Sequence, residues 1–159
     1  MSARSYPVKP GNWDLSGANF IDGGVNFCCF SRHATRVELL LFEDDMAVEP
    51  FQTIVLDPEV HRTFFFWHVL VEGLPECVCY GWRIDGPNDT RESGSRFDPG
   101  KLLLDPWCTT VSDRLWDRRR ACEPGDNLAT AMRARVVRDD YDWEGDQHCH
   151  VPLSDAVIY

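Results

Sequence analysis

The stretch "GVNFCCFSRHATRVELLLF", residues 24–42, decides the fold because it holds two strand patterns separated by a short polar turn. In 24–30 and in 36–42 apolar side chains recur at every second position, which is the period of a β-strand. The alternation puts Val25, Phe27 and Cys29 on one face of the first strand, and Val37, Leu39 and Leu41 on one face of the second. The opposite face of the first strand then carries Asn26, Cys28 and Phe30.

The adjacent cysteines Cys28 and Cys29 raise the question of a chemical site. Neighbouring residues in a strand point to opposite faces, so the two thiols cannot hold one metal ion together. Unpaired cysteine is among the most buried residue types and packs there as a small apolar side chain. The sequence therefore predicts that both cysteines belong to the core.

Three further strand patterns follow at 51–56, 62–71 and 78–85, separated by turn residues. The segment "RTFFFWHVLV" (62–71) is the richest in the aromatic and β-branched residues that favour strands. In 78–85 we expect a core face of Val78, Tyr80, Trp82 and Ile84, and an opposite face of Cys79, Gly81, Arg83 and Asp85. Short strands at this spacing predict an all-β fold, an immunoglobulin-like antiparallel β-sandwich.

The second half of the chain has a different pattern. Loop-forming residues fill 86–100, and beyond them Leu128, Met132 and Arg135 recur at a helical interval, with Asp126 or Asn127 as a possible N-cap. We predict a lead-in at 1–22, the sandwich module at 23–111, and an irregular, partly helical extension at 112–159. The ending "DAVIY" resembles the start of a strand, so we expect the sequence to be part of a longer chain.

Charge and composition exclude several classes of function. The net charge of −10 repels nucleic-acid backbones and anionic lipid surfaces. The first residues lack the apolar core of a signal peptide, and the longest apolar run is far shorter than the roughly 20 residues that span a bilayer. We therefore predict a cytoplasmic protein that binds neither nucleic acid nor membrane. Its seven cysteines are expected to remain reduced thiols.

Several patterns approach known catalytic or metal sites without completing them. Cys77 and Cys79 could join "HCH" (148–150) around zinc, but the usual ligand spacings are absent. "DYDWEGD" (140–146) resembles the start of a calcium loop, whose twelfth position would be Val151 instead of glutamate. Nothing fixes two carboxylates about 5–9 Å apart, as a glycosidase requires, and "ESGSRF" only approaches a nucleophile elbow. We predict no catalytic residue, no metal and no cofactor.

The polar face of the 78–85 strand is a candidate glycan contact. Arg83 and Asp85 point away from the expected core face and could meet solvent, a glycan or another domain. Sugars are commonly bound by flat aromatic faces together with such polar groups. Because Tyr80 and Trp82 are assigned to the core, only the polar half of such a site is present on this strand.

Residues 23–45 and 80–107, the latter reading "YGWRIDGPNDTRESGSRFDPGKLLLDPW", resemble a known family. They are similar to the N-terminal domain of isoamylase-type glycogen debranching enzymes in glycoside hydrolase family 13, which is classed as carbohydrate-binding module family 48. The tail, "YDWEGD" (141–146) and "VPLSDAVIY" (151–159), resembles the segment that leads into the catalytic barrel of those enzymes. The resemblance implies a β-sandwich module on an α-amylase-type barrel that cleaves α-1,6 branch points of glycogen or related glucans.

On this resemblance the family's catalytic acids lie in the barrel, and no residue of this chain takes their roles. We expect the chain to be an accessory domain that packs on the barrel through a surface made of Arg96, Phe97, Asp105, Pro106 and Trp107. A free-standing α-glucan-binding module is the alternative, and an enzyme in its own right is a third. Glycan-binding relatives carry Trp, Lys and Trp where this sequence has "FEDD" (42–45), Gly81 and Pro87.

Overall fold

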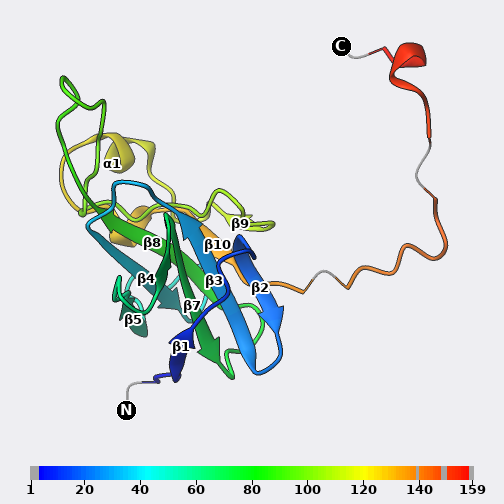
Figure 1. Ribbon diagram of the computed structural model, residues 1–159, viewed down its shortest axis with the longest axis horizontal. Helices are drawn as coiled ribbons and strands as arrows, with labels where there is room; N and C mark the ends of the chain where they lie inside the picture. Colours follow the sequence, from blue (N-terminus) through cyan, green and yellow to red (C-terminus); the bar gives the residue numbers. More distant parts are fainter. Residues whose placement is uncertain (1–3, 139, 148–149, 158–159) are drawn as a thin grey trace.

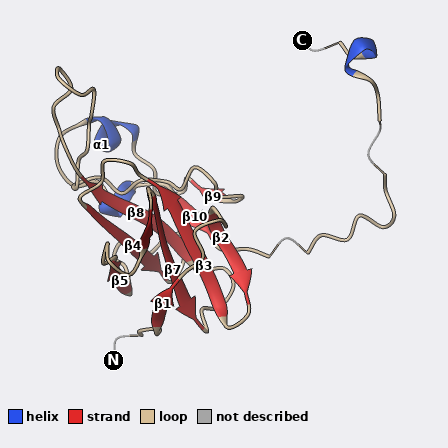
Figure 2. Cartoon of the chain, viewed as in Figure 1, coloured by secondary structure: helices blue, strands red, loops and turns tan. Residues whose placement is uncertain are grey.

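The structure is a computed structural model that describes residues 4–138, 140–147 and 150–157. Two antiparallel sheets pack face to face, as Figures 1 and 2 show. The first sheet has the strand order β1 (Val8–Pro10), β7 (Phe66–Glu72), β3 (Gly24–Phe30), β2 (Gly17–Ile21), and β6 (Arg62–Thr63) also pairs with β7. The second has the order β5 (Gln52–Val55), β4 (Arg36–Phe42), β8 (Cys79–Asp85), β10 (Arg133–Arg135), β9 (Val111–Ser112). The predicted all-β sandwich is confirmed.

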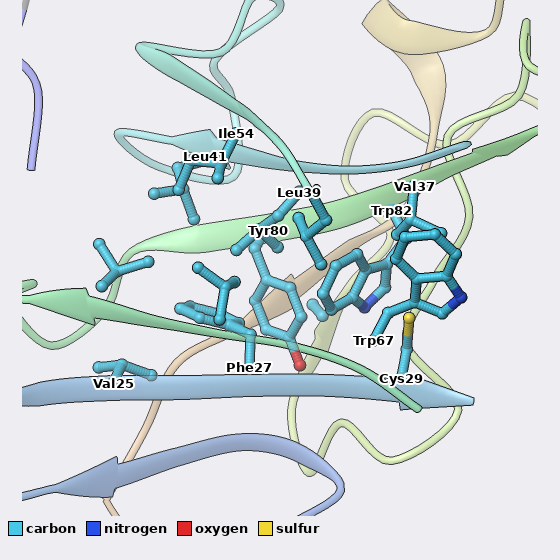
Figure 3. Close-up of a cluster of buried hydrophobic side chains, with 14 of the residues drawn as sticks. Val25, Phe27, Cys29, Val37, Leu39, Leu41, Ile54, Trp67, Tyr80 and Trp82 are labelled. Carbon is cyan, nitrogen blue, oxygen red and sulfur yellow. The ribbon is translucent and has the colours of Figure 1, made fainter. Parts of the chain in front are cut away.

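The main core lies between the two sheets and is made by alternate residues of their central strands (Figure 3). From β3 and β4 it receives the two sets of three side chains that the alternation placed together on one face of each strand, all at most 4% exposed. From β7 and β8 it receives Trp67, Tyr80 and Trp82, which are fully buried or nearly so. The rings of Phe27 and Tyr80 meet across the gap, edge to face, with their centroids 5.0 Å apart. The two-residue period therefore located this core correctly.

A second, smaller core lies on the outer face of the β4–β8 pair. Leu40, Phe42 and Cys79 project there and are covered by Leu102, which follows β8, and by Ala131 of the extension. Arg133 is 1% exposed beside them, and its guanidinium lies 3.9 Å from the centre of the Phe42 ring. Carbonyl oxygens of Ala131 and Leu128 accept its N–H groups. Part of the extension therefore packs on the sandwich.

The predicted helix through Leu128, Met132 and Arg135 is wrong. Only Leu128–Thr130 forms a 3-10 turn, and Arg133–Arg135 is strand β10. Ala134 pairs with Tyr80 of β8 on one side and with Val111 of β9 on the other. The free edge of β8 offers this segment backbone hydrogen bonds, and that tertiary pairing overrides a weak local preference. The helix that does form, α1 (Arg118–Cys122), is capped by the Asp117 side chain.

The sheets also take in strands from outside 23–111. β1 and β2 lie in the predicted lead-in, and β10 lies in the predicted extension. In the other direction, the predicted strand 62–71 is divided into β6 and β7, because Phe64 has a φ of +54°. This left-handed backbone cannot continue a strand. Beyond β10, residues 140–147 and 150–157 run away from the two sheets (Figure 1).

Both adjacent cysteines are buried, as predicted, and they lie on opposite faces of β3. Cys29 faces the main core at 4% exposure, and Cys28, on the opposite face, is fully buried. The Cys28 thiol donates to the Trp13 carbonyl oxygen at 3.4 Å, beneath the loop that leads into β2. Burial, with a contribution from the Asp105 charge, raises the pKa of Cys28 to about 11. At neutral pH this thiol stays protonated and unreactive.

Candidate docking site

Residues 101–107 lie beside β8 and build the candidate site. Leu103 forms a one-residue bridge with Trp82: the Trp82 N–H donates to the Leu103 carbonyl at 2.9 Å, and the reverse bond is 2.7 Å long. On one side of this bridge, Leu102 points into the second core and its N–H donates to the buried Asn127 side chain at 2.7 Å. A side chain at Gly81 would meet the Leu102 side chain at 2.9 Å, so glycine leaves the room that Leu102 needs.

Asp105 fixes the other end of this segment from inside the domain. Its Oδ2 atom accepts the Tyr80 O–H at 3.0 Å and the Trp82 Nε1–H at 3.3 Å, while Oδ1 accepts the Trp107 N–H at 2.8 Å. The residue is 1% exposed. Burial, reinforced by the Asp105 charge, raises the pKa of Tyr80 far above its ordinary value, so Tyr80 remains a donor. Three hydrogen bonds from the protein thus replace those that the buried carboxylate would otherwise accept from water.

The anchored segment lines two apolar surface hollows that share Ile84, Phe97 and Leu103. The larger, of about 440 Å³, is lined by Cys29, Phe30, Ser31, Trp82, Ile84, Phe97, Leu103, Leu104, Pro106 and Trp107. The smaller, of about 300 Å³, is lined by Ile84, Arg96, Phe97, Asp98, Lys101 and Leu103. Trp107 is 65% exposed and Leu103 42%. We call these two hollows and their rims the docking site.

Four of the five residues predicted for a packing surface meet at this docking site. Arg96 and Phe97 line the smaller hollow, and Pro106 and Trp107 line the larger. Asp105 does not belong to the surface, and that part of the prediction is wrong. Its carboxylate turns inward because the hydroxyl and indole donors of β8 are buried and need an acceptor. Sequence reasoning missed Leu103 and Ile84, which line both hollows.

Four of the described cysteines have thiols that stay protonated at neutral pH. Burial raises the pKa of Cys29, Cys79 and Cys108, as it does for Cys28. In 4–138, 140–147 and 150–157, no three His, Cys, Asp or Glu side chains cluster closely enough to hold a metal ion. Two residues of the "HCH" zinc hypothesis, 148 and 149, lie outside these ranges. The acidic side chains of 140–146 that are described are exposed.

Comparison with known proteins places this β-sandwich. Residues 16–108 match the family model described as carbohydrate-binding module 48, the isoamylase N-terminal domain. The chain belongs to the carbohydrate-binding module 48 family. The predicted resemblance is therefore confirmed, and the matched residues include β2 to β8 and the anchored segment that builds the docking site.

Curated relatives of this family member are glycogen debranching enzymes. The protein of that name from Enterobacter sp. (strain 638) is 38% identical over 149 residues, which are 90% of this chain but 22% of the relative. The one from Klebsiella pneumoniae (strain 342) is 39% identical, with the same two coverages. The chain thus spans about a fifth of the length of the curated relatives it matches. Pullulanase from Bacillus acidopullulyticus has the same fold, with a TM-score of 0.57, 16% identity, and coverage of 86% of this chain and 14% of that one.

In this carbohydrate-binding module 48 chain, Arg83 and Asp85 lie on the outer face of β8, as the alternation predicted. They are only partly exposed there. Arg83 forms an ion pair with Asp126 of the extension, and the Asp85 side chain accepts the Gly86 N–H at 2.8 Å. The sequence pattern could not reveal that residues 100–133 return to cover much of this face. Glycan contact through Arg83 and Asp85 stays a prediction.

No helix in the described ranges is long and apolar enough to cross a membrane.

Proposed function

We propose that this chain is the non-catalytic N-terminal module of a glycogen debranching enzyme and that it packs on the catalytic domain of the same polypeptide through the docking site. The observation that carries the proposal is a pair of apolar hollows on a rigid floor. Leu103 and Asp105 fix this floor to β8, so Phe97, Pro106 and Trp107 are presented in a set arrangement. Apolar surface of this kind, rimmed by Arg96 and Lys101, is typical of an interface.

The match to longer relatives supports the same proposal. A chain that spans 22% of a glycogen debranching enzyme leaves room for a complete catalytic domain in such a protein. The parent would hydrolyse α-1,6 branch points of a glucan in the cytoplasm, and this module would help to shape the groove that receives the glucan.

The test compares two paired serine variants in the full product of the natural gene. Replacing Phe97 and Trp107 together with serine in the full product should lower the activity on branched glucan and expose the module to proteolysis. Replacing the exposed Arg118 and Arg119 of α1 with serine is the matched control, which should leave both properties unchanged. If the paired serine variant keeps full activity and full protease resistance, the docking role is wrong.

A direct contact with α-glucan is the second part of the proposal, and it would use Arg83 and Asp85. It is supported by the family to which the chain belongs and by the partial exposure of both residues. Replacing Asp126 with alanine removes the partner of Arg83 and should therefore strengthen binding of maltoheptaose, measured by isothermal titration calorimetry. Equal heats with and without Arg83→Ala would remove this part of the proposal and leave the docking role intact.

A further inference from the structure

Five aromatic rings form an exposed cluster next to the docking site, and we call it the aromatic patch: Trp13, Phe30, Phe64, Phe65 and Phe66. The rings come from the loop before β2, the end of β3, the turn between β6 and β7, and the first residue of β7. Trp13 packs on Phe64 and Phe66 with centroid distances of 6.5 and 5.9 Å, and Phe30 packs on Phe65 and Phe66 at 6.1 and 5.3 Å. Phe64 is 78% exposed and Phe30 57%.

The loop that carries Trp13 is held in place by the strand beneath it. Asn26, which is fully buried in β3, accepts the Asn12 N–H at 2.6 Å and donates to the Asn12 carbonyl at 3.0 Å. Gly11 lies so close that a side chain there would meet the Asn26 oxygen at 2.5 Å. A buried amide thus secures the loop from below, and the Trp13 ring is placed rather than left free.

Phe64 is also held in position, at a cost to its backbone. Its φ of +54° lies in the left-handed region, which bulky residues rarely adopt. The Arg62 side chain donates to the Phe64 carbonyl at 2.9 Å and so supports this turn. Strain of this kind persists only where the surrounding structure enforces it, and here it projects an apolar ring into solvent.

The charges beside the patch differ in sign from the protein as a whole. The net charge of the chain is −10, yet Arg32 and Arg62 border the patch. Arg32 lies 5.4 Å from the centre of the Phe65 ring, and Arg62 lies 5.1 Å from that of Trp67. Within the described parts of the chain neither guanidinium forms an ion pair with a carboxylate. Tryptophan, phenylalanine and arginine are the residues enriched at the centres of protein interfaces.

The patch continues directly into the docking site. Phe30 contacts Phe65 and Phe66 on one side and lines the larger hollow, with Trp107 and Pro106, on the other. Phe30 also pairs with Phe66 across β3 and β7, so the ends of these strands lie side by side (Figure 1). One apolar surface therefore extends from Phe97 to Phe64.

We infer that the aromatic patch is the second half of the surface that receives the catalytic domain, and that the facing segment of that domain is apolar with carboxylates opposite Arg32 and Arg62. This inference rests on the proposed docking role. Three observations select the catalytic domain as the partner. The patch is continuous with the docking site, its two arginines have no carboxylate partners among the described residues, and the relatives are much longer than this chain. The ring geometry favours protein over sugar: three of the four ring contacts in the patch are edge to face, and Arg32 lies over Phe65, so few flat faces remain for pyranose stacking.

Hydroxyl-radical footprinting with mass spectrometry tests the inference on the 159-residue chain and on the full product of the natural gene. In the full product the oxidation rates of Phe64 and Phe65 should fall about fivefold, since a ring that is 78% exposed becomes buried in an interface. Met46, 48% exposed on the β4–β5 connection, is the reference. Unchanged rates at Phe64 and Phe65 would overturn the inference, while protection of Phe97 and Trp107 in the same experiment would leave the docking role standing.

Two further measurements on the isolated chain exclude other occupants. Protection of Phe64 and Phe65 by maltoheptaose would make the patch a glucan site and overturn the inference. Protection that increases with protein concentration, together with a dimer in sedimentation, would assign the patch to a second copy of this chain and overturn it equally. The expected result is that neither condition changes the rates.

Variants separate the two halves of the surface. Docking should raise the thermal unfolding midpoint of the module in the full product above that of the isolated chain, because binding stabilises the folded state. Phe64→Ser with Phe65→Ser should reduce this difference while leaving the midpoint of the isolated chain unchanged, and Arg32→Glu should reduce it more at low salt than at high salt. The inference fails if the Phe64 and Phe65 variant keeps the whole difference in unfolding midpoint while the Phe97 and Trp107 variant loses it. That result would show that the catalytic domain contacts only the docking site.

Discussion

The aromatic side chains of this small domain form two groups, one buried and one exposed. Phe27, Trp67, Tyr80 and Trp82 are at most 1% exposed, whereas the rings of the aromatic patch and Trp107 lie at the surface. The buried group faces the main core from β3, β7 and β8, and its polar atoms have partners: Trp67 donates to the Ser31 carbonyl at 3.3 Å, and the Asp105 carboxylate accepts from Tyr80 and Trp82. The exposed group lies in turns and at strand ends. Whether a ring faces the interior of the sandwich, rather than its residue type, separates the ring that stabilises the fold from the ring available to a partner.

The largest effect should come from removing a buried ring. Trp82→Ala leaves a cavity between the sheets and should cost about 3–5 kcal/mol of unfolding free energy, measured by urea denaturation. Trp107→Ala removes the same side chain from an exposed position and should change stability by less than about 0.5 kcal/mol. Similar losses in the two variants would show that the division between the groups is wrong.

The second largest loss of unfolding free energy should come from removing the buried acceptor, Asp105. Asp105→Ala leaves the Tyr80 hydroxyl and the Trp82 indole N–H buried without a partner, which should cost about 1–3 kcal/mol in the same measurement. Asp113→Ala, at an exposed position, is the matched control. If Asp105 lay at the surface, as the sequence predicted, Asp105→Ala would lower the free energy of unfolding no more than the control Asp113→Ala does.

Acidic pH should produce a smaller loss through His68. This side chain is 5% exposed on the outer face of β7; its Nε2 atom lies 3.0 Å from the Thr63 hydroxyl, and Nδ1 has no partner among the described residues. Burial, with the nearby His61 charge, lowers the pKa of His68 from its ordinary 6.5. The unfolded chain therefore binds this proton at a higher pH than the folded chain does, and stability should fall as the pH drops below 6.5.

Urea denaturation at several pH values between 7.5 and 5.5 measures this loss. His68→Leu should flatten the pH dependence in that range. His33→Leu, at an exposed position, should keep it. A slope that is the same in wild type and in His68→Leu would assign the effect to other groups.

The smallest effect should lie in the exposed group. At position 64 the φ of +54° favours glycine over a residue with a side chain, so Phe64→Gly should be more stable than Phe64→Ala by about 1 kcal/mol. Both variants lose the ring, and the difference between them isolates the backbone strain. Equal stabilities would mean that the turn relaxes when the ring is removed, and that Phe64 is not held in position by its surroundings.

The sequence located the main core well because a two-residue period needs only local information. The strands predicted at 24–30 and 36–42 have the same bounds as β3 and β4. By contrast, the single strand predicted for 62–71 concealed the β6–β7 turn, since nothing in a run of three phenylalanines marks a positive φ.

Contacts between residues far apart in the chain explain the features that could not be predicted from the sequence. β10 follows a helical interval in sequence, and only the free edge of β8 makes it a strand. Asp105 follows three leucines in a loop, and only the buried donors of Tyr80 and Trp82 turn it inward. The docking residues Arg96, Phe97, Pro106 and Trp107 came from resemblance to a family, whereas Leu103 and Ile84 became visible once the Trp82–Leu103 bridge was known.

The pairing of β1 with β7 and of β10 with β8 also has a kinetic consequence. Val8 meets Val71, and Ala134 meets Tyr80, so each sheet is completed by a partner more than fifty residues away along the chain. On the ribosome the second sheet must wait for Ala134 to leave the exit tunnel, and until then the edge of β8 can pair with strands of neighbouring nascent chains. High contact order of this kind is typical of sandwiches that fold in milliseconds to seconds.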